Sequence, residues 1–331
     1  MHKGQTVLIT GGTGSFGNAV TKRLLQEEVK EIRIFSRDEK KQEDMRRRYH
    51  DDRLHFYIGD IRDFSRCRQV LCGVDAVFHA AALKQVPGCE RHPFEAYKTN
   101  VAGTENLLLS AREAGVKRLV FLSTDKAVYP INAMGLSKAM MEKLVLAEAA
   151  FPGIPNGALC LTRFGNVICS RGSVIPLLIE QLLTGRSMTL TDPDMTRFLM
   201  TLEDAADLAV RALENGENGE IIVPRLVSTT MGTLAKAVAL VVGRPPAIEI
   251  IGARPGEKKH ETLVTEEEAS CTKERDGCYH IQMKKAQTPA LLGAYTSDKN
   301  IVEDPNQVAE LLSSSGTFVR AIERTAKMLS V

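Results

Sequence analysis

The chain lacks the sequence features of a metal-binding, disulfide-bonded or membrane-spanning protein. None of its seven cysteines forms a CxxC pair, so we expect neither a zinc site nor a disulfide framework. Its seven histidines are scattered without metal-ligand spacing, and no apolar run approaches the roughly 18 residues that a transmembrane helix needs. The first residues carry no apolar segment of the signal-peptide kind. We therefore expect a soluble, reduced, cytoplasmic protein without a bound metal.

Neither sign of charge predominates in the sequence. The 43 basic residues nearly balance the 41 acidic ones, which leaves a net charge of +2. Because the two signs are interspersed, no overall field favours nucleic acid or a membrane surface as a partner. The apolar content of 44% is that of an ordinary globular protein with a sizeable core.

Short apolar runs alternate with amphipathic stretches in the first half of the chain. This alternation predicts an α/β fold of right-handed β-α-β units, with a doubly wound parallel sheet and helices on both faces. After about residue 165 loop signals multiply, so we expect a first domain over 1–165, rejoined near 198–213, and a smaller lobe over most of 166–331. The expected strands are Thr6–Thr10, Glu31–Phe35, Leu54–Ile58, Ala76–His79, Arg118–Ser123 and Leu159–Arg163, and the expected helices are Phe16–Glu28, Glu39–Tyr49, Ser65–Cys72, Pro93–Glu113 and Leu136–Ala149.

A glycine-rich turn joins the first expected strand to the first expected helix. Its glycines fall as GxxGxxG, in which the first allows a tight turn, the second admits a pyrophosphate and the third lets the helix pack on the strand. The phosphates then bind amides at the positive end of the helix. No Gly-Lys-Ser/Thr follows, which excludes a P-loop. The pattern predicts a Rossmann-type dinucleotide site built from Gly11, Thr13, Gly14, Ser15, Phe16 and Gly17.

The end of the second strand bears on the choice between NAD and NADP. NAD enzymes usually carry an acidic residue there, which binds the ribose 2′-hydroxyl. Here Ser36 and Arg37, with Lys40 beyond, suit a 2′-phosphate, so we expect NADP. Two alternatives stay open: Arg37 as a solvated surface residue, and Asp38 as a ribose ligand. Further contacts with the dinucleotide are expected from Asp60, Ile61, Ala80, Ala81 and Ala82.

The fifth strand ends in Ser123-Thr124-Asp125-Lys126, and Met134 and Lys138 follow one helical turn apart. With the glycine turn, His79-Ala-Ala-Ala82 and Asn100, this segment resembles the extended short-chain dehydrogenase/reductases that modify nucleotide sugars. Longer phrases resemble, more narrowly, the inverting UDP-N-acetylglucosamine 4,6-dehydratases (5-epimerising) of bacterial capsule and O-antigen synthesis. The resemblance covers residues 5 to 265 and rests on Ala82–Pro87, Ser123–Ala127, Pro130–Gly135, Ser170–Pro176 and Thr191–Phe198.

The resemblance implies a dehydration in three steps: hydride leaves C4 of the sugar for NADP⁺, water is eliminated across C5 and C6, and hydride returns to C6. It implies that Asp125, in the same turn as Thr124, protonates the departing C6 hydroxyl. Retaining relatives place a glutamate base next to this aspartate, and this chain has Lys126 there. We predict that Lys126 removes the C5 proton, with Lys84 assisting. A lysine serves as a base only if its pKa falls well below about 10.4.

One position departs from most relatives, because Met134 stands where they carry the tyrosine of Tyr-x-x-x-Lys. A thioether cannot accept the C4 hydroxyl proton. The resemblance implies that Lys138 keeps its ribose-binding role and that Asn100 and Lys84 lie at the cofactor. It leaves the base for C4 oxidation open between Lys126 and a relayed water.

The second lobe is expected to hold UDP. The resemblance implies that Asn166 contacts the sugar diphosphate, and arginines clustered after the sixth strand offer donors to a pyrophosphate. For any one of these arginines a surface salt bridge is the alternative. Relatives form dimers or hexamers, so a homo-oligomer is expected as well. The expected substrate-binding residues are Lys84, Asn166, Arg171, Ser173, Arg197, Arg254 and Glu257.

These features together predict an NADP-dependent UDP-N-acetylglucosamine 4,6-dehydratase with C5 inversion, which serves the biosynthesis of a surface polysaccharide. Two alternatives stay open. The first is a 4-epimerase or keto-reductase of nucleotide sugars, which does not need the Asp125-Lys126 pair. The second is a non-catalytic NADP-binding regulator. The methionine at position 134 suggests it, because loss of a catalytic phenol can make an enzyme inactive.

Overall fold

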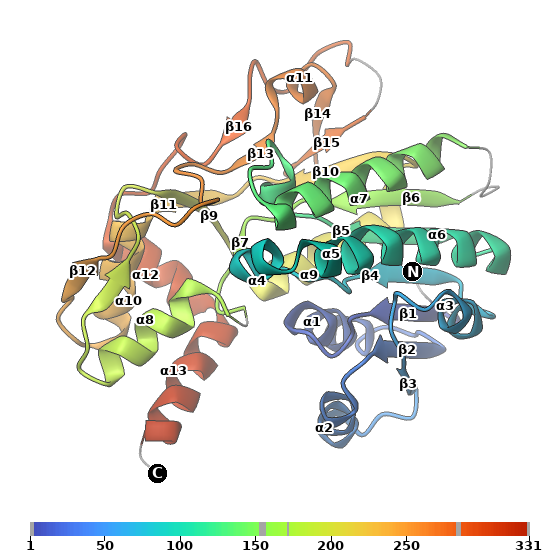
Figure 1. Ribbon diagram of the computed structural model, residues 1–331, viewed down its shortest axis with the longest axis horizontal. Helices are drawn as coiled ribbons and strands as arrows, with labels where there is room; N and C mark the ends of the chain where they lie inside the picture. The colour runs from blue at the N-terminus through green and yellow to red at the C-terminus, as the bar shows by residue number, and fades with distance from the viewer. Residues whose placement is uncertain (1–2, 152–156, 171, 283–285, 330–331) are drawn as a thin grey trace.

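The computed structural model describes residues 3–151, 157–170, 172–282 and 286–329. Within them, a nine-stranded sheet runs in the order β14-β15-β10-β6-β5-β4-β1-β2-β3, and only β14 and β15 are antiparallel to their neighbours (Figure 1). This is the Rossmann-type sheet that the strand–helix alternation predicts. Its strands are β1 (Thr6–Thr10), β2 (Glu31–Ser36), β3 (Leu54–Ile58), β4 (Ala76–His79), β5 (Arg118–Leu122), β6 (Ala158–Thr162), β10 (Glu220–Pro224), β14 (Thr272–Arg275) and β15 (Cys278–Ile281).

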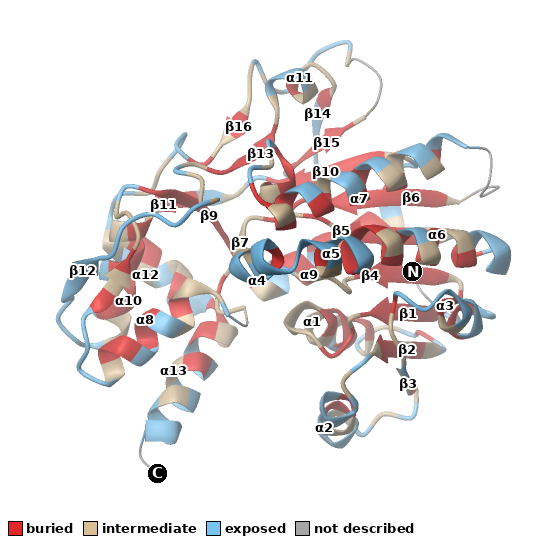
Figure 2. Ribbon diagram, in the orientation of Figure 1, coloured by how far each residue is buried: buried red, intermediate tan, exposed pale blue. Residues whose placement is uncertain are grey.

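Helices cover both faces of this sheet, which is why its central strands β1, β4 and β6 are buried at every position (Figure 2). Successive side chains of β1 enter different cores: Leu8 packs with the helices of one face, and Val7 and Ile9 with those of the other. The first face carries α3 (Phe64–Leu71), α6 (Gly103–Ala114) and α7 (Ala133–Ala150), and the second carries α1 (Ser15–Leu24), α2 (Glu39–Tyr49) and α9 (Leu202–Asn215).

Most predicted elements of the first half are confirmed to within a few residues, but the single helix predicted over Pro93–Glu113 is wrong. A wide π-turn, η1 (Tyr97–Ala102), interrupts it between α5 (Pro93–Ala96) and α6, and a short α4 (Val86–Arg91) precedes it. The turn brings Gly103 against Ile61, where an added Cβ would lie 2.8 Å from the isoleucine side chain. Apolar periodicity does not reveal such an insertion.

The remaining chain forms a second lobe with its own apolar core (Figure 1). Strand β10 and the β14–β15 hairpin nevertheless join the main sheet, and α9 returns to it over part of the segment expected near 198–213. The division of the chain at residue 165 stays a prediction. The lobe contains η2 (Asp125–Ala127) at its border, β7 (Asn166–Val167), α8 (Val174–Leu183), β8 (Met188–Leu190), β9 (Thr196–Met200), β11 (Val227–Thr230), α10 (Met231–Val242), β12 (Ile248–Ile250), β13 (Thr262–Val264), α11 (Glu266–Ala269), β16 (Tyr295–Thr296), α12 (Pro305–Ser314) and α13 (Gly316–Leu329).

A buried ionic cluster ties the lobe to the sheet. Arg163, directly after β6, donates to both carboxylate oxygens of Glu142 on α7 at 2.9 and 2.7 Å. The same guanidinium donates to Glu268 on α11 at 2.7 and 2.8 Å and to the Leu263 carbonyl at 2.9 Å. Because its donors are shared between helices of the sheet and the lobe, Arg163 fixes how the two parts meet.

Among the described residues, no helix is long and apolar enough to cross a bilayer. Exposed apolar side chains do occur on α5, η1 and α7, where Phe94, Tyr97, Leu136 and Met140 are each more than half exposed. Such side chains suit burial against another protein surface. The homo-oligomer expected from the sequence stays a prediction.

Candidate active site

A cleft of about 1030 Å³ lies at the carboxyl ends of β1, β2, β4 and β5, between the sheet and the second lobe. This is where open α/β sheets bind their ligands. Its volume is at the upper end of the range for single-ligand pockets, about 300–1000 Å³. The cleft therefore has room for a dinucleotide and a second ligand.

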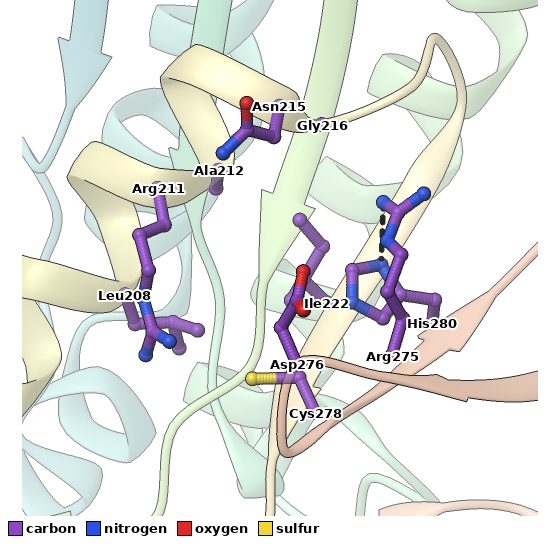
Figure 3. Close-up of a pocket in the computed structure, with 10 residues that line it drawn as sticks. All are labelled: Leu208, Arg211, Ala212, Asn215, Gly216, Ile222, Arg275, Asp276, Cys278 and His280. Atoms are coloured by element: carbon purple, nitrogen blue, oxygen red, sulfur yellow. Dashed lines mark hydrogen bonds between the residues drawn. The ribbon is translucent and has the colours of Figure 1, made fainter.

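A much smaller pocket of about 40 Å³ lies between α9 and the β14–β15 hairpin (Figure 3). Arg211 and Asn215 approach it from the helix, and Arg275 and His280 from the hairpin, where the two side chains are in contact at 3.2 Å. His280 also lies 2.9 Å from the buried Glu220 carboxylate. A space of this size holds a water or two. The large cleft is therefore the candidate active site.

The glycine-rich turn forms one end of the cleft and has the predicted geometry. Gly11 has φ +63°, a backbone conformation that residues other than glycine rarely adopt. A Cβ on Gly17 would lie 2.3 Å from the Gly12 carbonyl oxygen, so α1 packs on the turn only because this residue is glycine. The residues of the turn that line the cleft are Gly11, Thr13, Gly14, Ser15, Phe16 and Gly17.

Ser36 and Arg37 line the cleft beyond this turn, as does Asp60, whose carboxylate lies 3.5 Å from the Arg37 guanidinium. The Arg37 side chain is 55% exposed. Asp38 also borders the cleft, but its carboxylate caps α2 by accepting from the Lys41 amide at 3.0 Å. That engagement weakens the alternative in which Asp38 binds a ribose.

Lys40 does not reach the cleft, contrary to the prediction. Its ammonium pairs with Asp44 one helical turn along α2, and its side chain is 79% exposed. The prediction chose the wrong lysine of α2, because Lys41 and not Lys40 lies on the side of the helix that borders the cleft. The other cationic residue beside Arg37 is therefore Lys41, which pairs with Asp38.

Asn100 also lies outside the cleft, as a correction to its predicted cofactor contact. Its side chain is only 1% exposed and binds both the amide and the carbonyl of Leu83, at 2.8 and 2.9 Å, and the Ser137 hydroxyl at 2.9 Å. These partners occupy the amide group fully. Asn100 thus holds in place the loop from which Ala80, Ala81, Ala82 and Lys84 line the cleft.

His79 at the end of β4 is a core residue. Its ring nitrogens lie 2.8 Å from the Thr10 hydroxyl and 3.1 Å from the Thr104 hydroxyl. Burial, and secondarily the nearby charge of Lys138, lowers the pKa of His79 to about 3. The ring is therefore neutral and carries no charge into the cleft.

The turn after β5 places Thr124 and Lys126 on the cleft wall and Asp125 behind them. The Asp125 side chain is 0% exposed, and its Oδ1 accepts from the Thr124 hydroxyl at 2.8 Å and from the Lys126 ammonium at 2.9 Å. Its Oδ2 is buried without a hydrogen-bond partner among the described residues. Asp125 therefore lies behind the cleft wall, with Thr124 and Lys126 between its carboxylate and the cleft.

Lys126 has a second carboxylate neighbour that the sequence did not single out, Glu261. Their side chains lie 3.4 Å apart. Burial opposes the charge of Lys126, but Asp125 and Glu261 outweigh it and raise the pKa of the ammonium above its ordinary value. The surroundings of Lys126 thus raise its pKa rather than lower it, and its assignment as the C5 base stays a prediction.

Glu261 lies among three basic side chains at the cleft wall. Besides Lys126, it lies 3.7 Å from the Lys258 ammonium and 3.9 Å from Arg197. Burial lowers the pKa of Lys258. Both Lys258 and Glu261 line the cleft. The only sequence signal for them is their place in a charged segment that follows Arg254-Pro255-Gly256.

Met134 and Lys138 face the cleft from α7. The Lys138 ammonium donates to the Leu122 carbonyl at 2.5 Å and contacts the Met141 sulfur at 3.0 Å. Burial lowers the pKa of Lys138 to about 8. Met134 makes this part of the cleft wall apolar. The lysine beside it releases its proton at a lower pH than an exposed lysine does.

The predicted substrate residues form the lobe side of the cleft, where Asn166 lies 3.5 Å from Lys126. Arg197 is only 9% exposed, and its guanidinium donates to the backbone carbonyls of Thr196 and Lys258, at 2.7 and 3.0 Å. It therefore shapes this wall rather than presenting a free guanidinium. Arg171 lies outside the described residues. The remaining predicted residues on this side are Ser173, Arg254 and Glu257.

Comparisons with known proteins agree with this architecture. The family described as Polysaccharide biosynthesis protein matches residues 7–283. A protein of Rickettsia prowazekii (strain Madrid E) named UDP-glucose 4-epimerase is 49% identical over 328 residues, which span 94% of this chain and 96% of the relative. The X-ray structure of Pen from Bacillus thuringiensis superposes with a TM-score of 0.91 at 34% identity and covers 96% of this chain and 99% of that one.

A further solved structure carries a dehydratase name. It is DesIV, a dTDP-glucose 4,6-dehydratase from Streptomyces venezuelae, with NAD and TYD bound, at a TM-score of 0.70 and 26% identity over 76% of this chain and 86% of that one. The broader resemblance stated from the sequence, to the extended short-chain dehydrogenase/reductases that modify nucleotide sugars, is thus confirmed, whereas the narrower one to the inverting dehydratases stays a prediction. The chain belongs to the polysaccharide biosynthesis protein family, and its fold is that of the extended short-chain dehydrogenase/reductases that modify nucleotide sugars.

Proposed function

We propose that this protein is a nucleotide-sugar 4,6-dehydratase that acts on UDP-N-acetylglucosamine and uses NADP. The observation that carries the proposal is the Asp125–Lys126 pair at the carboxyl end of β5, whose lysine lines the large cleft. Elimination of water across C5 and C6 needs a proton for the departing hydroxyl. A 4-epimerase needs no such donor, because it breaks no C–O bond in the sugar.

The cofactor proposal rests on the shape and charge of the first half of the cleft. The Gly11 turn and the Ala80–Ala82 loop leave no room for side chains: a Cβ on Gly11 would lie 2.8 Å from the Ala81 nitrogen. Backbone can therefore approach a pyrophosphate closely there. Arg37, on the cleft wall beside Asp60, is the group proposed to select a 2′-phosphate. A bound nicotinamide would accept hydride from C4 and return it to C6.

The residues of the catalytic turn then have defined tasks. Lys126 presents a proton at the cleft surface, and the Asp125 carboxylate below it stabilises the ammonium charge. Thr124 fixes the Asp125 carboxylate through its hydroxyl. Oxidation at C4 comes first because a C4 ketone acidifies the proton on C5, which an unactivated sugar does not release.

A second candidate function, UDP-glucose 4-epimerase, is favoured by the names of the similar Rickettsia proteins, at 48–52% identity. Those names fit the epimerase better than the dehydratase. Position 134 does not separate the two functions, because both reactions begin by removing the C4 hydroxyl proton. The Asp125–Lys126 pair favours the dehydratase, because an epimerase has no departing hydroxyl to protonate.

Mass spectrometry of the sugar nucleotide after incubation with the purified protein separates the two functions. A dehydratase converts UDP-N-acetylglucosamine into a product lighter by one water. An epimerase leaves the mass unchanged and interconverts UDP-glucose and UDP-galactose. Turnover of UDP-glucose without mass loss, and no reaction with UDP-N-acetylglucosamine, would replace the proposed function by the second candidate.

A further inference from the structure

Asn132 lies at the start of α7, where the catalytic turn meets the second lobe, and has no task in the proposed function so far. Its side chain is only 5% exposed and borders the cleft. The amide group has two partners in different parts of the fold. Its Oδ1 accepts from the Gly135 amide at 2.8 Å and so caps α7. Its Nδ2 donates at 2.9 Å to the carbonyl of Gly256, which lies 124 positions later, in the second lobe.

The helix that Asn132 caps lies directly on the backbone of the catalytic turn. A Cβ on Gly135 would lie 2.3 Å from the Lys126 carbonyl oxygen, so the first turn of α7 and the turn after β5 are in backbone contact. The same helix presents Met134 and Lys138 to the cleft. A shift at the start of α7 therefore moves both the support of Lys126 and one wall of the cleft.

The other partner of Asn132 belongs to a tight turn of the lobe, Arg254–Glu257, whose two end residues are predicted to bind UDP. The Glu257 amide donates to the Arg254 carbonyl at 3.1 Å, and the Arg254 amide donates to the Glu257 carboxylate at 3.3 Å. Both residues line the cleft. Gly256 between them has φ +81°, and a Cβ on it would lie 3.2 Å from the Asn132 Cβ. The turn therefore lies against Asn132 through a residue that favours glycine.

A second contact connects the same two segments. The Lys258 ammonium, just after the tight turn, donates to the carbonyl of Val128, which follows the catalytic turn. Lys258 also lies 3.7 Å from Glu261, which in turn lies 3.4 Å from Lys126. The part of the lobe predicted to hold the nucleotide is thus bonded to the loop that joins the catalytic turn to α7.

Resting on the proposed function, we propose that Asn132 is a positioning residue that couples nucleotide binding at the Arg254–Glu257 turn to the geometry of the catalytic turn. A nucleotide on this turn fixes the Gly256 carbonyl. The Asn132 amide then holds the start of α7, and α7 supports the backbone of Lys126. Binding energy from the part of the substrate that does not react is in this way used to orient the part that does.

Three substitutions of Asn132 separate the cap from the bridge to Gly256. Asn132→Ser keeps an oxygen that caps a helix but has no group that reaches Gly256. Asn132→Asp keeps the shape and the capping oxygen but turns an acceptor toward the Gly256 carbonyl, and the serine variant controls for its added charge. Asn132→Ala removes both. The matched control is Asp304→Ala, which removes the N-cap of α12 in the second lobe.

The test measures amide hydrogen exchange by mass spectrometry in the whole chain loaded with NADP, with and without UDP. In the native protein and in Asp304→Ala, we expect UDP to slow the exchange of peptides that cover residues 125–136 by roughly 3- to 10-fold, the effect of about one hydrogen bond. In Asn132→Ser and Asn132→Asp the slowing should fall below about twofold, although calorimetry still detects UDP binding.

Turnover of UDP-N-acetylglucosamine gives a second measurement. In Asn132→Ser we expect kcat to fall roughly tenfold, because the reacting groups are less well oriented, and KM to change little. Asp304→Ala should keep both constants close to the native values. Asn132→Ala should lose as much kcat as Asn132→Ser and more stability in urea, because it also lacks the cap.

Four results would overturn the proposal. They are no protection by UDP in the native protein, equal protection in Asn132→Ser, loss of UDP binding in both Asn132→Ser and Asn132→Asp, and an equal fall of kcat in Asp304→Ala. Failure of the native protein to release water from UDP-N-acetylglucosamine is a different result. It would remove the proposed function, whereas the exchange measurement, which involves no turnover, would still decide the coupling.

Discussion

Replacing Arg163 with methionine should destabilise the protein strongly, because the arginine neutralises two carboxylates in the interior. Its own side chain is 4% exposed and that of Glu142 is 6% exposed. Removing one partner of a buried ion pair leaves an uncompensated charge, which costs about 3–5 kcal/mol of unfolding free energy. Methionine keeps most of the apolar volume, so the loss reports the charge and not a cavity.

Urea unfolding followed by far-ultraviolet circular dichroism measures this loss, since the chain has no tryptophan for fluorescence. The double variant Arg163→Met, Glu142→Gln should recover part of it, because the stranded carboxylate is then neutral. Glu268 matters less, as its side chain is 24% exposed and can turn toward water. A loss below about 1 kcal/mol, or a double variant no more stable than Arg163→Met, would refute the argument from buried charge.

The same cluster predicts a pH dependence with a definite sign. Burial raises the pKa of Glu268, but its hydrogen bonds from Arg163 outweigh burial and hold that pKa below the ordinary 4.5. A carboxyl group whose pKa is lower in the folded state stabilises the fold above its unfolded pKa and loses that contribution as pH falls through the folded pKa. The difference in unfolding free energy between native protein and Arg163→Met should therefore shrink below about pH 4.5. A difference that is constant down to pH 3 would contradict this linkage.

Three further substitutions test other parts of the cleft. Arg37→Ala should weaken NADP roughly tenfold and NAD little; equal losses, measured by calorimetry, would remove Arg37 as the selector of the 2′-phosphate. Gly17→Ala should abolish dinucleotide binding, because its Cβ would meet the Gly12 carbonyl at 2.3 Å, whereas Gly88→Ala, with its nearest contact at 3.6 Å, should be tolerated. Asn100→Ala should lower the unfolding free energy by about 1–3 kcal/mol, because the amide and carbonyl of Leu83 lose their partner; an unchanged urea midpoint would contradict the support role.

Sequence reasoning reached the first half of the fold because local signals and tertiary structure agree there. The strand Thr6–Thr10 and the helix Glu39–Tyr49 are confirmed residue for residue. The glycine turn was found for the same reason, since its spacing follows directly from how a helix packs on a strand. Asn100 was misplaced because a buried polar residue near a motif looks the same in sequence whether it faces a ligand or the backbone behind the wall.

Lys126 shows where such reasoning ends. Its position in the Ser123–Lys126 turn was read correctly, but the direction of its pKa depends on a carboxylate 135 positions later in the chain, 3.4 Å away in space. No periodicity or spacing connects positions 126 and 261, because the contact exists only after β13 has brought the lobe against the end of β5. A lysine next to one aspartate could act as a base if burial prevailed. A lysine between two carboxylates keeps its proton more firmly, because both negative charges raise its pKa.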